Sequence, residues 1–157
     1  MTILACDPGY DRLGVAIVAG TVHSPSLVFS TCLSSSKDQS HAYRIGELAQ
    51  GISAIIEEHQ PDVLATETLF FARNTSTALK VAEVRGMLCT LAAQTNLDVI
   101  EHSPQEIKMA VTGYGNANKN EVITMTKRLV PNAPAKARDD EYDAIALGIC
   151  ALASYRK

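Results

Sequence analysis

Acidic side chains follow two apolar runs in this chain. Residues 3–6 lead into Asp7 and a Pro-Gly turn, and residues 63–66 lead into Glu67. A short apolar run that ends in this way is typical of a buried strand, and ligands of open α/β sheets bind at the C-terminal ends of strands. Both acids are therefore candidate site residues. Asp7 could instead serve only to open the turn, since Asp, Pro and Gly are all common turn residues.

Two further acids lie near the start of the last expected helix, residues 139–155. Asp140 and Asp143 follow the same three- and four-residue steps as the apolar positions that should face a sheet. Acids also favour the first turn of a helix for capping and dipole reasons, and Asp139 is expected to be such a cap. The shared face of Asp140 and Asp143 favours a functional role for this pair.

Four carboxylates that meet at one place would repel and desolvate one another unless cations neutralise them. Oxygen ligands favour Mg²⁺ or Mn²⁺ over zinc or copper. Two such ions about 4 Å apart can activate a water molecule and stabilise the leaving oxygen in a displacement at phosphorus. If the two acid-ended strands are neighbours, the sequence predicts metal-dependent hydrolysis of phosphodiesters.

The elements that must position these acids follow from the spacing of the apolar residues. Three antiparallel strands are expected first, at residues 3–7, 13–18 and 27–32, and Pro25 places the third at a sheet edge or a bulge because proline cannot donate to a ladder. The later elements are expected as a helix at 41–59, a strand at 62–67, a loop at 69–74, a helix at 75–94, a strand at 97–101 and the closing helix.

Two more helices are expected from capping signals. Ser103 is followed by Pro104 and by Glu106 at the third helical position, which is a capping box. Asn118 with Glu121 is a weaker version of the same signal.

Length and composition favour a single domain over residues 1–157. The chain has no apolar run of about 20 residues and no signal-peptide pattern, so a cytoplasmic location is expected. Its four cysteines stand apart without metal-ligand spacing, which makes a zinc site improbable. The net charge of −3 argues against coating of nucleic acid by bulk electrostatics but not against a basic face.

An ordered set of short motifs covers nearly the whole chain. Its members are Asp7-Pro8-Gly9, Gly14, Glu67, Phe70, Ala72, Asn74, Ala78-Leu79-Lys80, Arg85-Gly86, Lys108, Gly113-Tyr114-Gly115, Lys119 and residues 140–146. Each is weak alone, but the set resembles the RuvC family of Holliday-junction resolvases. The resemblance implies a ribonuclease H-like α/β fold, with a mixed five-stranded sheet flanked by helices on both faces.

The resemblance also implies roles for individual residues. The catalytic metal ligands, for two Mg²⁺ ions that Mn²⁺ can replace, would be Asp7, Glu67, Asp140 and Asp143. Lys108 and Lys119 would contact phosphate near the cleaved strand. Cations beside clustered acids are also what an anionic backbone requires, although most lysines are simply solvated.

Further DNA contacts are expected around the loop after Glu67. Phe70 matches an exposed aromatic residue of the family that stacks on or wedges between bases, whereas no role is carried over to Phe71. Arg73, Lys80 and Arg85 could extend a basic face, or they could belong to an ordinary salt-bridged helix surface.

The expected partner is four-way branched DNA, with no membrane involved. Its approximate two-fold symmetry favours a homodimer, for which the helix at 75–94 is the expected interface, and the family implies a branch-migration motor as a further partner. Three alternatives remain open: a ribonuclease H-like nuclease of broader specificity for branched DNA or hybrids, a catalytically inactive junction-binding module, and an actin-like ATPase or sugar kinase. The chain is too short for the two domains of the last.

Overall fold

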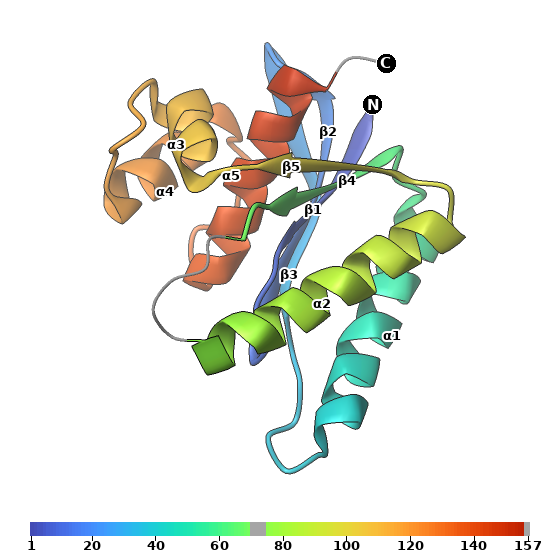
Figure 1. Cartoon of the computed structure of the whole chain (residues 1–157). Coiled ribbons are helices and arrows are strands. Elements are labelled where there is room, and N and C mark those ends of the chain that lie inside the picture. The colour runs from blue at the N-terminus through green and yellow to red at the C-terminus, as the bar shows by residue number, and fades with distance from the viewer. Residues whose placement is uncertain (70–74, 156–157) are drawn as a thin grey trace.

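The computed structural model describes residues 1–69 and 75–155. Within these residues, five strands form one mixed sheet in the order β3-β2-β1-β4-β5 (Figure 1). The strands are β1 (Thr2–Asp7), β2 (Arg12–Thr21), β3 (Ser24–Ser34), β4 (Val63–Glu67) and β5 (Asp98–His102). The β1-β2-β3 meander is antiparallel, while β4 runs parallel to both β1 and β5.

Helices cover both faces of this sheet (Figure 1). One face carries α1 (His41–His59) and α2 (Thr75–Gln94). The other carries α3 (Pro104–Thr112), α4 (Lys119–Leu129) and α5 (Asp139–Ser154), with α5 lying directly on β1 and β2. The observed architecture confirms the fold class expected from the sequence.

Alternation along β1 explains how one strand serves two cores. Leu4 and Cys6 are fully buried among side chains of α1 and α2, whereas Ile3 and Ala5 are fully buried against α5. Because successive side chains of a strand point to opposite faces, Asp7 follows Ile3 and Ala5 toward the α5 face.

Close contact between α5 and the sheet depends on a glycine. A Cβ atom on Gly148 would lie 2.5 Å from Cγ2 of Val18 and 3.4 Å from Cβ of Ala5. The helix can therefore lie against β1 and β2 without a side chain between them, and this fixes the height of α5 above the sheet.

The edge position of β3 is confirmed, and so is an irregularity in its ladder. Pro25 lies opposite Gly20, and the register with β2 shifts between Ile17 and Val18. The hairpin is longer than expected, since pairing continues through polar exposed residues to Thr21 and Ser24. The extension was not predicted because its residues are polar, and strands were located from the pattern of apolar residues.

Both capping boxes are present. Ser103 Oγ accepts a hydrogen bond from the Glu106 amide at 3.2 Å, and Glu106 Oε2 accepts one from the Ser103 amide at 2.7 Å. Asn118 and Glu121 make the same reciprocal pair at the start of α4. These caps satisfy amides that the first turns of α3 and α4 leave without partners.

Replacement of Ser103 by alanine is expected to lower the free energy of unfolding by about 1 kcal/mol, because the Glu106 amide loses its acceptor. Urea denaturation measures the loss. Ser53→Ala is the matched control, since Ser53 is exposed within α1 and alanine favours a helix interior. Equal stability of Ser103→Ala and the wild-type protein would show that the cap contributes nothing.

No helix among the described residues is long and apolar enough to span a membrane.

Candidate active site

The two strand-end acids lie at one edge of the sheet because their strands are parallel neighbours. Cys6 pairs with Thr66, so Asp7 and Glu67, the last residues of β1 and β4, lie next to each other at the C-terminal ends of these strands. This adjacency was the condition on which the sequence-based prediction of a shared acidic site depended, and it is met.

The start of α5 is brought to the same edge by Gly14, which pairs with Asp7 across the β1-β2 ladder. A Cβ atom on Gly14 would lie only 1.9 Å from the carbonyl oxygen of Asp140. The first turn of α5 therefore rests on bare backbone beside Asp7, which is possible only for glycine at this position.

The cap expected at Asp139 is wrong. Arg138 is the N-cap residue, with an extended backbone and no capping hydrogen bond from its side chain. The helix begins at Asp139, the first residue of the expected range, so Asp139 lies in its first turn, where its carboxylate pairs with Lys119 at 3.2 Å.

Burial and mutual repulsion raise the pKa values of Asp7, Glu67 and Asp143. The pKa of Asp7 is raised from 3.8 to about 7, first by burial and then by the charges of Glu67, Asp143 and Asp140, with Lys119 opposing the rise. Burial is likewise the main cause of the raised pKa values of Glu67 and Asp143. The site thus holds more negative charge than its own cations neutralise.

Two acids of α5 are each paired with a cation. Arg12 Nε lies 3.2 Å from Asp140 Oδ2, and Lys119 Nζ lies 3.3 Å from Asp143 Oδ2. Among residues 1–69 and 75–155, no three His, Cys, Asp or Glu side chains are arranged so that they could hold a metal ion. The fold therefore brings the four acids to one edge without closing them into a coordination shell.

Divalent metal ions nevertheless fit the chemistry of this edge. Its donors are carboxylate oxygens, which suit Mg²⁺ and Mn²⁺, and the raised pKa of Asp7 marks a place that a cation would stabilise. Ion binding by Asp140 and Asp143 would require both carboxylates to exchange their present partners, Arg12 and Lys119, for the ions.

Two hollows flank the acids. We call the first, of about 260 Å³, the α3–α4 hollow; its lining includes Glu67, Asp143, Lys108 and Lys119. The second, of about 320 Å³, is the turn hollow at the β1-β2 turn, and it is lined by Gly9, Tyr10, Asp11, Arg12, Arg44, Thr77, Lys80, Val81 and Asp140. Each hollow thus places at least one cation beside one of the α5 acids.

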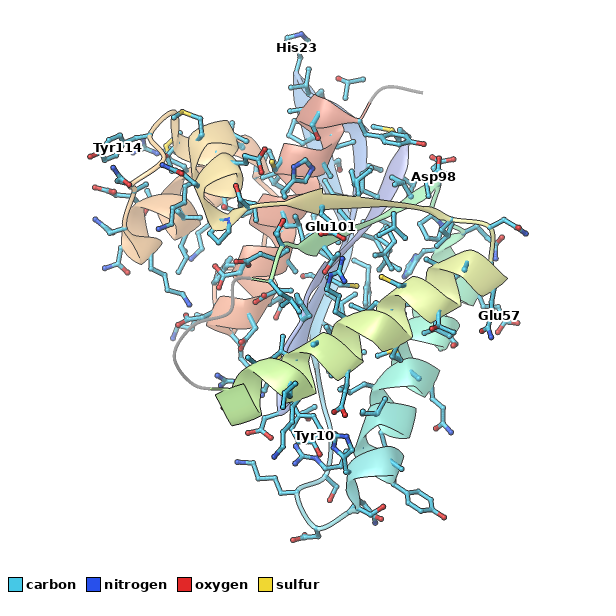
Figure 2. All side chains as sticks on the ribbon, in the orientation of Figure 1. Tyr10, His23, Glu57, Asp98, Glu101 and Tyr114 are labelled. Carbon is cyan, nitrogen blue, oxygen red and sulfur yellow. The ribbon has the colours of Figure 1, made fainter. Side chains whose placement is uncertain are left out.

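The turn hollow contains a cluster that the sequence analysis missed. The Arg44 guanidinium carbon lies 4.1 Å from the ring centroid of Tyr10, and Arg44 also pairs with Asp11 at 2.5 Å and donates to Ser35 Oγ (Figure 2). These contacts anchor the turn that follows Asp7. The available signal was spacing, since Arg44 falls on the stripe of α1 that buries Leu48 and Ile52.

The predicted DNA contacts fall into three groups. Lys108 and Lys119 line the α3–α4 hollow, and Lys80 lines the turn hollow. Arg85 forms an ion pair with Glu101 that ties α2 to β5 (Figure 2). Phe70 and Arg73 lie outside the described residues, so their predicted roles are untested.

The site can be compared with known proteins. The family model described as crossover junction endodeoxyribonuclease RuvC matches residues 3–151. The chain belongs to this family. Relatives named crossover junction endodeoxyribonuclease RuvC occur in Natranaerobius thermophilus, at 35% identity over 99% of this chain and 97% of the relative, and in Pseudothermotoga lettingae, at 38% identity over 96% and 93%.

Solved structures agree with this membership. Thermus thermophilus RuvC in complex with a Holliday junction substrate matches with a TM-score of 0.90 at 25% identity, over 96% of this chain and 92% of that one. A Holliday junction resolvase from fowlpox virus shares the fold, with a TM-score of 0.60 at 17% identity over 97% and 98%. The sequence-based recognition of the RuvC family is confirmed.

Proposed function

We propose that this RuvC-family chain is a structure-selective endonuclease that resolves Holliday junctions by paired symmetric nicks, with residues 1–157 acting as one nuclease domain. The observation that carries the proposal is the convergence of Asp7, Glu67 and the start of α5 at one sheet edge, flanked by hollows that contain lysine and arginine. Family membership supports the substrate class.

The metal ions of this site would be held by Asp7, Glu67, Asp140 and Asp143, with Mg²⁺ as the proposed ion and Mn²⁺ as a substitute. When bound, a pair of such ions activates a water molecule and stabilises the leaving oxygen of the phosphodiester. The chain supplies the rigid part of the site, because Asp7 and Glu67 are fixed by paired strands and Asp140 by the contact with Gly14.

Lys119 and Lys108 would offset the negative charge of these acids and so allow the DNA backbone to approach them. Lys119 already pairs with Asp139 and Asp143, and Lys108 lies close enough to Glu67 for its charge to oppose the rise in the pKa of that acid. A phosphate that enters the α3–α4 hollow would take both lysines as partners while it approaches the carboxylates. Both residues would thereby hold the reacting phosphate in place.

Other DNA contacts would lie outside the α3–α4 hollow. Lys80 is exposed in the turn hollow and is proposed to contact a phosphate there. Phe70 remains a predicted contact at the junction centre, and Arg73 a predicted member of the basic face beside the site. Arg85 also stays a prediction, and its pairing with Glu101 gives it a structural role as well.

A homodimer through α2 would match the two-fold symmetry of the junction. The outward side of this helix carries small or apolar residues at steps of seven, four and three residues, which place them on one face. They are Leu79, Gly86, Thr90 and Ala93, all exposed in the single chain. The side chain of Leu79 is 63% exposed, and a Cβ atom on Gly86 would meet nothing within 4 Å, so a second helix has room to approach.

Replacement of Leu79 by glutamate is expected to shift the dimer to monomers, because a charge would then be buried in the interface. Analytical ultracentrifugation measures the shift, and Val28→Glu is the matched control, because Val28 is 55% exposed on β3. Monomers should also nick one strand of a junction without the paired second cut. A Leu79→Glu protein that stays dimeric would exclude α2 as the interface.

We further propose a branch-migration motor as a partner and the cytoplasm as the location. All four cysteines are free thiols, which suits a reducing compartment.

A nicking assay tests the proposed function. The protein is incubated with Mg²⁺ on a synthetic four-way junction, a three-way fork and a linear duplex that share one sequence. Paired symmetric nicks confined to the four-way junction are expected. Comparable cutting of the fork would favour the nuclease of broader specificity, and junction binding without cutting in either Mg²⁺ or Mn²⁺ would favour the inactive module.

A further inference from the structure

Arg12 is placed beside the acidic edge by the same geometry that brings α5 to the sheet. Arg12 and Gly14 lie on the same face of β2, whereas Leu13 between them packs on the α1 and α2 side. Gly14 lets the backbone of Asp140 touch β2. Because Arg12 is the neighbour of Gly14 on this face, its side chain reaches the Asp140 carboxylate. The Arg12–Asp140 pair is therefore a consequence of the fold.

The two partners differ in how freely they can move. The side chain of Asp140 is 24% exposed and belongs to the rigid first turn of α5, whereas that of Arg12 is 55% exposed and borders the turn hollow. An ion pair with one largely solvated partner is weak, so Arg12 can leave Asp140 at small cost.

The turn hollow offers Arg12 an anionic alternative. Of the cations that line it, Arg44 is committed to Asp11 and to the Tyr10 ring. Lys80 lies 5.0 Å from the centroid of the same ring and is exposed. A DNA phosphate in this hollow would find Lys80 and a released Arg12 as its available partners, and a guanidinium binds phosphate well.

We propose that Arg12 is an exchangeable counter-ion of Asp140, which neutralises this acid in the metal-free protein, leaves it when divalent ions bind, and then binds a DNA phosphate in the turn hollow. The inference rests on the proposed metal site. Arg12 thereby links the loading of metal ions to the binding of a DNA strand in the turn hollow.

Calorimetric titration of the full chain with Mn²⁺, without DNA, tests the first half of the proposal. Arg12→Ala is expected to bind Mn²⁺ about threefold more tightly than the wild-type protein, because the ion no longer displaces a guanidinium. Two control variants each remove a different positive charge. Lys80→Ala removes one that lines the same hollow, and Arg128→Ala removes one on α4, where the Arg128 guanidinium lies near Met125. Both should change the affinity less than about twofold, since screening weakens distant charges.

Steady-state cleavage of a four-way junction tests the second half. Arg12→Ala is expected to raise KM about fivefold and to leave kcat within about twofold. The reason is that the lost phosphate contact would stabilise the bound substrate and the transition state equally. Unchanged or weaker Mn²⁺ binding, tighter binding in both controls, or an unchanged KM would each overturn the proposal. The Mn²⁺ titration does not depend on cleavage, so failure of the proposed function would be recognised separately by absent cutting in the wild-type protein.

Discussion

Replacement of Asp7 by asparagine is expected to lower the rate of junction cleavage by at least about 10³-fold and, at the same time, to stabilise the metal-free protein. The first effect follows from the loss of a central metal ligand. The second follows from the raised pKa of Asp7, because asparagine occupies the same buried position without a charge that burial and Glu67 disfavour.

The gain in stability should depend on pH. A carboxyl group whose pKa is higher in the folded than in the unfolded protein destabilises the fold progressively as pH rises between the two values. For Asp7 this window runs from 3.8 to about 7. The free energy of unfolding of Asp7→Asn should therefore equal that of the wild-type protein below this pH range. Above the range it should be larger by on the order of 2–4 kcal/mol.

Urea denaturation in EDTA at pH 4 and pH 8 measures this difference, and added Mg²⁺ should reduce it, since the ion stabilises the wild-type acid. Asp38→Asn is the matched control, because Asp38 lies exposed in the connector before α1. An Asp7→Asn protein that is less stable than the wild-type protein at pH 8 in EDTA, or that cleaves at the normal rate, would contradict the account of this site.

Replacement of Gly14 by alanine is expected to damage both the fold and the activity. The added methyl group would overlap the Asp140 carbonyl, so α5 must move away from β2. Overpacking of this kind costs about 2–3 kcal/mol, and a displacement near 1 Å of the Asp140 carboxylate can lower the rate about 10²-fold. The rate should therefore be measured at a temperature at which circular dichroism shows the variant folded.

Gly46→Ala in α1 is the matched control, because a Cβ atom there meets nothing within 4 Å and alanine favours helices. It should leave cleavage unchanged and raise the free energy of unfolding by about 0.5–1 kcal/mol. Normal activity of folded Gly14→Ala would show that the contact between α5 and β2 does not position Asp140.

Local patterns in the sequence were sufficient to predict much of the fold. The apolar runs before Asp7 and Glu67 marked β1 and β4, and the capping boxes at Ser103 and Asn118 marked the starts of α3 and α4. Each of these signals involves only a few neighbouring residues, so it can be recognised without knowledge of the tertiary structure. The fold class followed from their order together with the family resemblance.

Boundaries that depend on tertiary contacts were less accurate. The strand expected at 97–101 is β5, which runs from Asp98 to His102, because Leu97 contacts α2 instead of extending the strand. Its amide bonds to the carbonyl of Ala92 at the end of α2, where Asn96 takes a left-handed conformation, and its side chain packs with the α1 and α2 core. An apolar residue beside a strand was therefore mistaken for part of it.

The partners of charged side chains could not be predicted from local patterns. Arg12 lies near one end of the chain and Asp140 near the other, and only the packing of α5 on Gly14 makes them neighbours. The burial of Arg44 depends likewise on Tyr10 and Asp11 from a different element. The acidic edge could therefore be located from the sequence, but the cations that pair with its carboxylates could not.

The most direct test of the metal site is anomalous diffraction from crystals of the protein soaked in Mn²⁺. Manganese is expected at the edge formed by Asp7, Glu67, Asp140 and Asp143, with Asp140 turned away from Arg12 and Asp143 away from Lys119. Manganese bound elsewhere on the chain, or an acidic edge that stays free of manganese at saturating concentration, would contradict the assignment of these carboxylates as the ligands.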